Sequence, residues 1–311
     1  MNSVTLEERV VGAYLGLAVG DALGATVEFM TPREILTLHQ EHRDIVGGGW
    51  LKLAPGRVTD DTEMSLALGD AILGFGPFDA TAVGRSFDNW MRSRPVDIGS
   101  TVRRGILEFR NKRNTEVPPN EHDGGNGACM RTLPVAIATL GMSDEAVVEA
   151  TRVQAHLTHN NPLSDAGTVA VVRMLQAFFK GATRVDVLHG EVRALVNEEP
   201  DFAFRRRREE NPSGFIVHTL RAVFQALFDT DTFEECLVDV VNRGGDADTT
   251  GAIAGMLAGA AFGNGAIPKR WLKKLDRDVQ AQCETQARAL LACATQRQFK
   301  EKWNDDAAER Q

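Results

Sequence analysis

The chain has 311 residues, 43% of them hydrophobic and 25% charged, and a formal net charge of −8. This length and composition allow one large buried core. The acidic balance argues against a protein that binds nucleic acid through its net charge. The cysteines show no CxxC pair and no metal-binding spacing, which predicts reduced thiols in a cytoplasmic protein. They are Cys129, Cys236, Cys283 and Cys293.

The first long apolar stretch predicts a helix over residues 10–28. Every fourth residue is a glycine, and this spacing places the glycines on one face of the helix. The run is long enough to suggest a membrane span, but Asp21 lies within it and Glu28 at its end, so we expect none. The glycines are Gly12, Gly16, Gly20 and Gly24.

A second stripe of glycines occurs near the end of the chain, in an apolar segment that predicts a helix buried on all sides. Each glycine lowers helix stability by about 1 kcal/mol relative to alanine. Eight such positions in two helices therefore predict that the helices pack closely at the centre of the fold. The second stripe consists of Gly251, Gly255, Gly259 and Gly263.

The residues Thr59-Asp-Asp-Thr-Glu63 come directly before a predicted helix over residues 64–75. One interpretation is a capping box, with Asp60 as N-cap and Glu63 three residues later. That box leaves Asp61 without a role. The other interpretation is a site for a hard divalent cation, which prefers carboxylate and hydroxyl oxygens.

A second acidic turn, Asn242–Gly251, precedes the later glycine-rich helix and contains Asp246, Asp248 and Thr249. Helix capping would need one or two of these acceptors. A helix N-terminus repels cations, so acids that gather there make more sense when a metal draws them together. The two turns together supply the four or more carboxylates that a pair of cations requires.

Between these turns lies a glycine-rich segment, Asp123-Gly-Gly-Asn-Gly127, which opens a helical run. Such a turn is suited to bind a pyrophosphate, although the same residues are common in ordinary loops. His159 follows later as an isolated histidine, most simply a hydrogen-bonding loop residue.

Three stretches, residues 12–29, 59–64 and 244–251, closely resemble the ADP-ribosylglycohydrolase family. The resemblance extends from about residue 10 to residue 276. It implies an all-α, single-domain orthogonal helical bundle with a dinuclear metal cleft. The domain would be 1–311, with its core at 10–302 and a frayed tail at 304–311.

The family implies a metal-dependent hydrolase that removes ADP-ribose from modified protein side chains, arginine first among them, with two Mg²⁺ or Mn²⁺ ions. One ion would be held by Thr59, Asp60 and Asp61 and the other by Asp246 and Thr249, with Asp248 between them. The resemblance assigns catalysis to Glu28 and Asp97. It places Ser100, Gly125, Asn126, Gly127, His159 and Phe215 at the substrate.

Two residues depart from the pattern of the nearest family members, because Phe215 replaces a tyrosine and Ser100 an asparagine. Both changes bear on which ADP-ribosylated protein is the preferred substrate. The resemblance suggests nitrogenase reductase as that protein. Two alternatives remain: a hydrolase of another linkage, such as O-acetyl-ADP-ribose or ADP-ribosyl serine, and a protein that binds ADP-ribose without turnover. We expect a monomer without a nucleic-acid partner.

Overall fold

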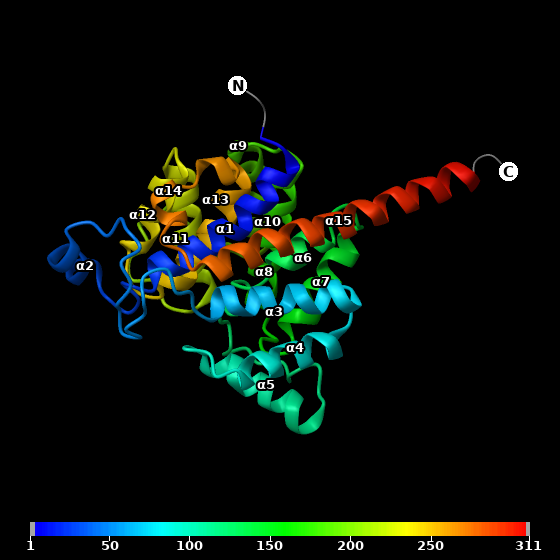
Figure 1. The fold of residues 1–311 in the computed structure, drawn as a ribbon, viewed down its shortest axis with the longest axis horizontal. Helices are drawn as coiled ribbons and strands as arrows, with labels where there is room; N and C mark the ends of the chain where they lie inside the picture. Colours follow the sequence, from blue (N-terminus) through cyan, green and yellow to red (C-terminus); the bar gives the residue numbers. More distant parts are fainter. Residues whose placement is uncertain (1–3, 309–311) are drawn as a thin grey trace.

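The computed structural model describes residues 4–308, and the side chains of residues 4–300. This part of the chain is helical, with two isolated β-bridges and no longer strand, which confirms the prediction of an all-α fold (Figure 1). The α-helices are α1 (Leu6–Gly24), α2 (Pro32–His39), α3 (Asp60–Phe75), α4 (Ala80–Arg92), α5 (Ser100–Lys112), α6 (Leu133–Ala138), α7 (Asp144–Ala155), α8 (Pro162–Phe179), α9 (Arg184–Val187), α10 (Arg193–Glu198), α11 (Ile216–Asp229), α12 (Phe233–Val241), α13 (Ala247–Phe262), α14 (Lys269–Leu272) and α15 (Arg277–Ala308).

Helices α1 and α13 lie side by side at the centre of the molecule (Figure 1). They run antiparallel, because Gly12 faces Gly259 and Gly20 faces Gly251. A Cβ atom at Gly16 would lie 2.1 Å from the carbonyl oxygen of Gly255, closer than any side chain tolerates. The predicted close packing is confirmed. We call this contact the glycine seam: Gly12, Gly16, Gly20, Gly251, Gly255 and Gly259.

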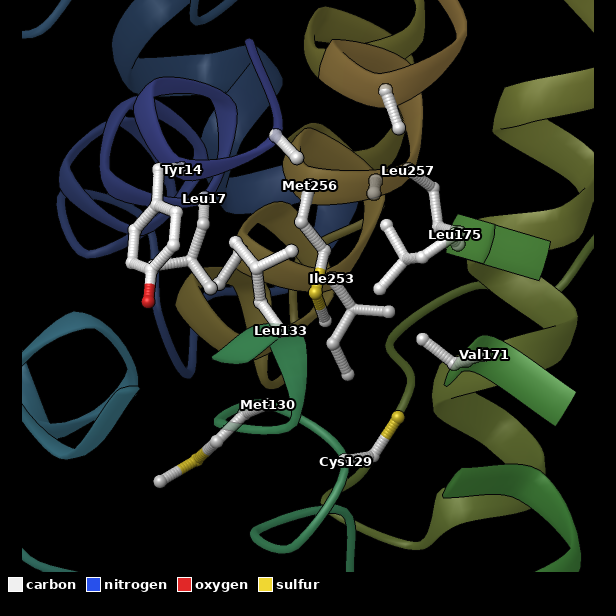
Figure 2. Packing of buried hydrophobic residues seen from close by; sticks show 14 of the residues in the cluster. Tyr14, Leu17, Cys129, Met130, Leu133, Val171, Leu175, Ile253, Met256 and Leu257 are labelled. Atoms are coloured by element: carbon white, nitrogen blue, oxygen red, sulfur yellow. The ribbon is translucent and has the colours of Figure 1, made fainter. Parts of the chain in front are cut away.

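The seam does not include the last glycine of the second stripe. Gly263 is the C-cap of α13 with a φ of 79°, a conformation that favours glycine. Apolar side chains from α1, α6, α8 and α13 surround the helix pair, among them Leu17, Leu133, Val171 and Met256 (Figure 2). The central pair is therefore held from several directions and forms the rigid part of the fold.

The predicted helix over residues 10–28 is too long at its C-terminal end. Helix α1 ends at Gly24, and the chain continues in a turn in which the Phe29 N–H donates to the Gly245 carbonyl at 2.7 Å. This bond ties the end of α1 to the turn before α13, and it places Glu28 on that turn instead of on a helix face.

The expected C-terminal tail at 304–311 lies within α15 as far as Ala308, and residues 309–311 fall outside the described part. No helix among the described residues is long and apolar enough to cross a membrane, as Asp21 indicated.

Candidate active site and metal centre

The N-terminus of α3 is capped by a residue from another helix. Thr59 is the N-cap, and its side chain makes no capping bond. Instead, the carboxylate of Asp21 on α1 accepts the N–H groups of Thr59 at 3.0 Å and of Thr62 at 3.2 Å. It also accepts both hydroxyl groups, at 2.9 and 2.5 Å. Asp21 thus satisfies the donors of this helix end.

The capping box considered for this helix is absent. Glu63 pairs with Arg57 and accepts the indole N–H of Trp90, so its carboxylate does not turn back to the N-cap. Asp60 is likewise not the N-cap but the first residue of α3. Because Asp21 does the capping, Asp60 and Asp61 are free for another role.

Asp61 is buried and incompletely bonded. One oxygen, Oδ2, accepts the hydroxyl of Thr249 at 3.4 Å and lies 3.2 Å from the hydroxyl oxygen of Thr59, whose proton goes to Asp21. The other oxygen, Oδ1, is buried and has no hydrogen-bond partner. A buried carboxylate oxygen without a partner is costly unless a cation or water completes its surroundings.

The N-terminus of α13 carries the second half of the site. Asp246 is the N-cap, again without a side-chain capping bond. Carboxylate oxygens of Glu28, Asp246 and Asp248 lie within 4.8 Å of one another. Asp246 accepts the side-chain amide of Asn126 at 2.6 Å. The contact between Thr249 and Asp61 joins this half to the α3 half, so the two acidic turns meet as the sequence predicts.

The five carboxylates of this acidic cluster (Glu28, Asp60, Asp61, Asp246 and Asp248) resist ionisation together. Burial, reinforced by the neighbouring carboxylates, raises the pKa of Asp60 to about 8 and that of Glu28 to about 7. The pKa values of Asp61 and Asp248 are raised well above the ordinary value, again chiefly by burial. Crowded hard oxygen donors with one orphaned oxygen are the surroundings that a divalent cation fits.

A cavity of about 370 Å³ opens beside the cluster. Thr59 and Asp61 are buried and absent from its lining. Phe215 is also absent from the lining, although its neighbour Gly214 is part of it, and its ring packs against Gly124. The predicted site residues that do line the cavity are Glu28, Asp60, Asp97, Ser100, Gly125, Asn126, Gly127, His159, Asp246, Asp248 and Thr249.

The glycine-rich turn packs directly on His159. A Cβ atom at Gly125 would lie 2.9 Å from His159 Nε2, and one at Gly127 would lie 2.8 Å from its Cε1. Asn126 holds the turn, since its N–H donates to the Gly214 carbonyl at 2.9 Å. The glycines are therefore required for the histidine ring to lie beneath the turn, at the wall of the cavity.

Comparison with known proteins fits this geometry. The family model of the ADP-ribosylglycohydrolases matches residues 2–300. The chain belongs to this family. It is 48% identical to the ADP-ribosyl-[dinitrogen reductase] glycohydrolase of Rhodospirillum rubrum, over 94% of this chain and 99% of that protein. It is 32% identical to the ADP-ribosylarginine hydrolase Tri1 of Serratia proteamaculans, over 86% of this chain and 75% of that protein.

A solved structure described as an ADP-ribosylglycohydrolase-related protein complex superposes with a TM-score of 0.83. It is 33% identical and covers 93% of this chain and 99% of that one. The arrangement of helices around the acidic cluster is thus the ADP-ribosylglycohydrolase fold.

A chain of hydrogen bonds sets the tautomer and the charge state of His159 in this glycohydrolase. The buried guanidinium of Arg131 donates to the Thr158 hydroxyl at 2.7 Å. That hydroxyl lies 2.8 Å from His159 Nδ1 and 3.5 Å from a carbonyl, so its proton goes to the ring. Nδ1 is therefore the acceptor, and Nε2 carries the proton. Burial and the charge of Arg131 lower the pKa of His159 to about 3, which keeps it neutral.

Sequence reasoning missed three contributors to the site. Asp21 was visible as an acid within an apolar helix, a signal that indicated burial but not its capping role. Thr158 carried no signal beyond its place before His159. Trp50 followed three glycines, and the structure shows its indole N–H donating to Glu28 at 2.5 Å.

Proposed function

We propose that this protein is a metal-dependent hydrolase that removes ADP-ribose from ADP-ribosylated arginine side chains. The observation that carries the proposal is the buried acidic cluster with its orphaned Asp61 oxygen, at the wall of a cavity that the glycine-rich turn also lines. The arginine linkage is supported by two relatives, whose names specify dinitrogen reductase and ADP-ribosylarginine. Nitrogenase reductase is accordingly the first carrier protein to test.

The α3 residues Thr59, Asp60 and Asp61 would hold one cation, either Mg²⁺ or Mn²⁺. Asp246 and Thr249 would hold a second, with Asp248 between the two. Bound cations supply Lewis-acid orientation of the ribose hydroxyls and acidify a water molecule. Asp21 orients Thr59 for this task, because it takes the hydroxyl proton and leaves the oxygen lone pairs for the site.

Glu28 would act as the general base. The residue is 5% exposed and lines the cavity beside the proposed cation ligands Asp246 and Asp248, so its carboxylate is available to accept a proton from a water molecule in the cavity. Glu28 would take a proton from the attacking water. The bond between the anomeric carbon and the guanidinium nitrogen then breaks, and the leaving nitrogen keeps its electron pair.

Two further residues and the glycine-rich turn would hold the substrate. Asp97 lines the cavity, and the charges of Asp97 and Glu28 interact, so Asp97 can orient the guanidinium of the substrate or supply a proton to the neutral guanidine that leaves. His159 presents a fixed Nε2–H, which can donate to a phosphate or ribose oxygen. The N–H groups of Gly125 and Gly127 suit an anionic pyrophosphate, whereas that of Asn126 already donates to Gly214.

The decisive experiment is the release of free ADP-ribose from an ADP-ribosyl-arginine peptide, with Mg²⁺, with Mn²⁺ and with a chelator. We expect release with either metal and loss of release with the chelator, restored by added metal. Parallel assays with ADP-ribosyl serine and O-acetyl-ADP-ribose should show slower turnover. No release from the arginine peptide at any metal concentration, together with tight ADP-ribose binding, would contradict the proposal and favour a binding protein.

A further inference from the structure

Two aromatic rings at the mouth of the cavity are exposed to solvent. The side chain of Phe29 is 64% exposed and that of Trp50 is 52% exposed. Their ring centroids lie 5.4 Å apart with the planes tilted by 49°. Both residues line the cavity beside Glu28 and Asp97. Large exposed apolar groups at a cavity usually mark a binding surface.

The backbone of Phe29 indicates that this exposure has a function. Its φ of 61° lies in the left-handed region, which a bulky residue rarely adopts. The bond from its N–H to Gly245 holds the backbone of Phe29 against the turn that carries Asp246. Strained residues of this kind persist mainly at functional sites, and an exposed ring offers the fold little in return for the strain.

Trp50 is held equally firmly, by a small loop. Gly47, Gly48 and Gly49 all have positive φ, and Gly48 pairs with Leu53 across the loop. A Cβ atom at Gly49 would lie 2.3 Å from the Ala25 carbonyl oxygen, so the loop packs against the end of α1. With its indole N–H on Glu28, Trp50 can offer only its face to a ligand.

The charge around these rings favours a cation. Of the five carboxylates that line the cavity, Glu28 and Asp97 are not among the proposed cation ligands, and no described lysine or arginine lines it. A planar guanidinium stacks on aromatic faces and donates hydrogen bonds to carboxylates. A neutral adenine would use the rings but not the acids, and the glycine-rich turn offers phosphate-binding groups around His159, with the Phe215 ring packed on the same turn.

We propose that Phe29 and Trp50, with Asp97, form a subsite for the guanidinium group of the ADP-ribosylated arginine. The inference rests on the proposed arginine activity and adds the residues that select this linkage. ADP-ribose alone lacks the guanidinium, so its binding does not depend on the subsite.

The test compares Phe29→Leu with Phe75→Leu. Phe75 is 68% exposed and ends α3, the helix that begins at Asp60, so it controls for the loss of an exposed phenyl ring. KM for an ADP-ribosyl-arginine peptide, Kd for ADP-ribose by calorimetry, and inhibition by agmatine are measured for each. For Phe29→Leu we expect KM and the agmatine inhibition constant to rise about three- to tenfold, in line with the usual strength of such contacts, with ADP-ribose binding unchanged. Phe75→Leu should match the wild type.

A second variant, Phe29→Asn, separates binding from folding. Asparagine tolerates the left-handed conformation, so its melting temperature should equal or exceed that of the wild type while KM rises as for leucine. Weakened ADP-ribose binding in Phe29→Leu would overturn the proposal and place adenine on the rings. An unchanged KM in either Phe29 variant would also overturn it. So would a lowered melting temperature of the variants large enough to explain the rise in KM by unfolding. Failure of the wild type to cleave the arginine peptide would contradict the proposed function, and agmatine binding would still test the subsite.

Discussion

The glycine seam and the acidic cluster meet at helix α13, where the cluster adds residues from α3 and from the turn after α1. The two regions satisfy their polar groups in opposite ways. Along the seam, backbone meets backbone without side chains, and apolar side chains pack around the helix pair. Three residues before Gly251, at Asp248, α13 carries part of the cluster, in which Asp61 Oδ1 from α3 has no hydrogen-bond partner.

The difference shows how the fold keeps several buried carboxylates close together despite their cost in stability. Carboxylates gathered at helix N-termini destabilise a metal-free protein through burial and mutual repulsion. The seam supplies rigid packing immediately behind them, and Asp21 extends from the seam helix α1 to cap α3. The cluster therefore depends on the seam for its geometry, whereas the seam does not depend on the cluster.

The largest effect is expected from breaking the seam. Gly16→Val would place side-chain atoms where the Gly255 carbonyl lies, 2.1 Å from the position of Cβ. Forcing the central helices apart should cost about 5 kcal/mol or more, comparable with the whole stability of many domains. We expect no folded protein by circular dichroism and size-exclusion chromatography.

The matched control is Gly74→Ala in α3, where nothing lies within 4 Å of the added Cβ. That change should leave stability unchanged or raise it by up to about 1 kcal/mol, through helix propensity alone. A Gly16→Val protein that melts like the wild type would show that the helix pair can separate without loss.

The next largest effect concerns the cluster alone. Asp248→Asn removes a carboxylate that is 2% exposed and close to Glu28 and Asp246. Turnover should fall at least about a hundredfold, since loss of even a supporting group around a metal costs ten- to a hundredfold. The metal-free variant should melt at or above the wild-type temperature, because one buried charge has gone.

Single-turnover release of ADP-ribose and metal-free melting curves measure the two outcomes. If Asp248 served only the helix end, asparagine would replace it well. Near-normal turnover in Asp248→Asn would therefore remove the metal role from this residue.

A smaller effect is expected from pH and metal on the stability of the unaltered protein. The folded pKa values of Asp60 and Glu28, about 8 and about 7, exceed their ordinary values of 3.8 and 4.5. Between about pH 4 and pH 8 the folded, metal-free protein therefore holds more protons than the unfolded chain. Its stability is greatest at the low end of this range and falls as pH rises through it.

A bound cation replaces those protons, so Mg²⁺ or Mn²⁺ should raise the melting temperature more at pH 8 than at pH 5. Binding at a hundred times Kd stabilises by about 2.7 kcal/mol per site. Melting curves at both pH values, with metal and with EDTA, test this. Equal midpoints with and without saturating metal at pH 8 would argue that no cation binds the cluster.

The seam could be predicted from sequence because its signal is local and periodic. Glycine at every fourth residue of two apolar segments has few explanations other than close helix packing. The acidic turns also showed the right residues, and the structure brings them together as expected. The sequence did not show which acids cap the helix and which are free to bind a metal, because the cap of α3 comes from Asp21, 38 residues before Thr59.

The end of α1 and the mouth of the cavity were less predictable. A helix continuing to Glu28 satisfied the hydrophobic pattern, but the turn that stops it is fixed by a bond from Phe29 to Gly245, over two hundred residues away. Trp50 likewise reaches Glu28 only because its loop packs against the end of α1. Such contacts depend on tertiary packing, which local propensity does not contain.

The smallest effect, and the sharpest test of how finely the cavity is built, concerns Thr158. Thr158→Val keeps the shape of the side chain but removes the hydroxyl between Arg131 and His159, so Nδ1 loses its donor and the ring tautomer is no longer fixed. We expect KM to rise or kcat to fall by about three- to tenfold, which corresponds to the loss of one neutral hydrogen bond and a less well aligned His159 ring. Thr158→Ser keeps the hydroxyl and should restore wild-type kinetics.

The nitrogen NMR chemical shifts of His159 report its tautomer directly. We expect a protonated Nε2 in the wild type and in the serine variant, and a mixture of tautomers in the valine variant. The seam and cluster should remain intact in all three proteins, as shown by unchanged metal-induced stabilisation. An unchanged tautomer in Thr158→Val would mean that the glycine-rich turn, rather than the chain of hydrogen bonds, sets the form of His159.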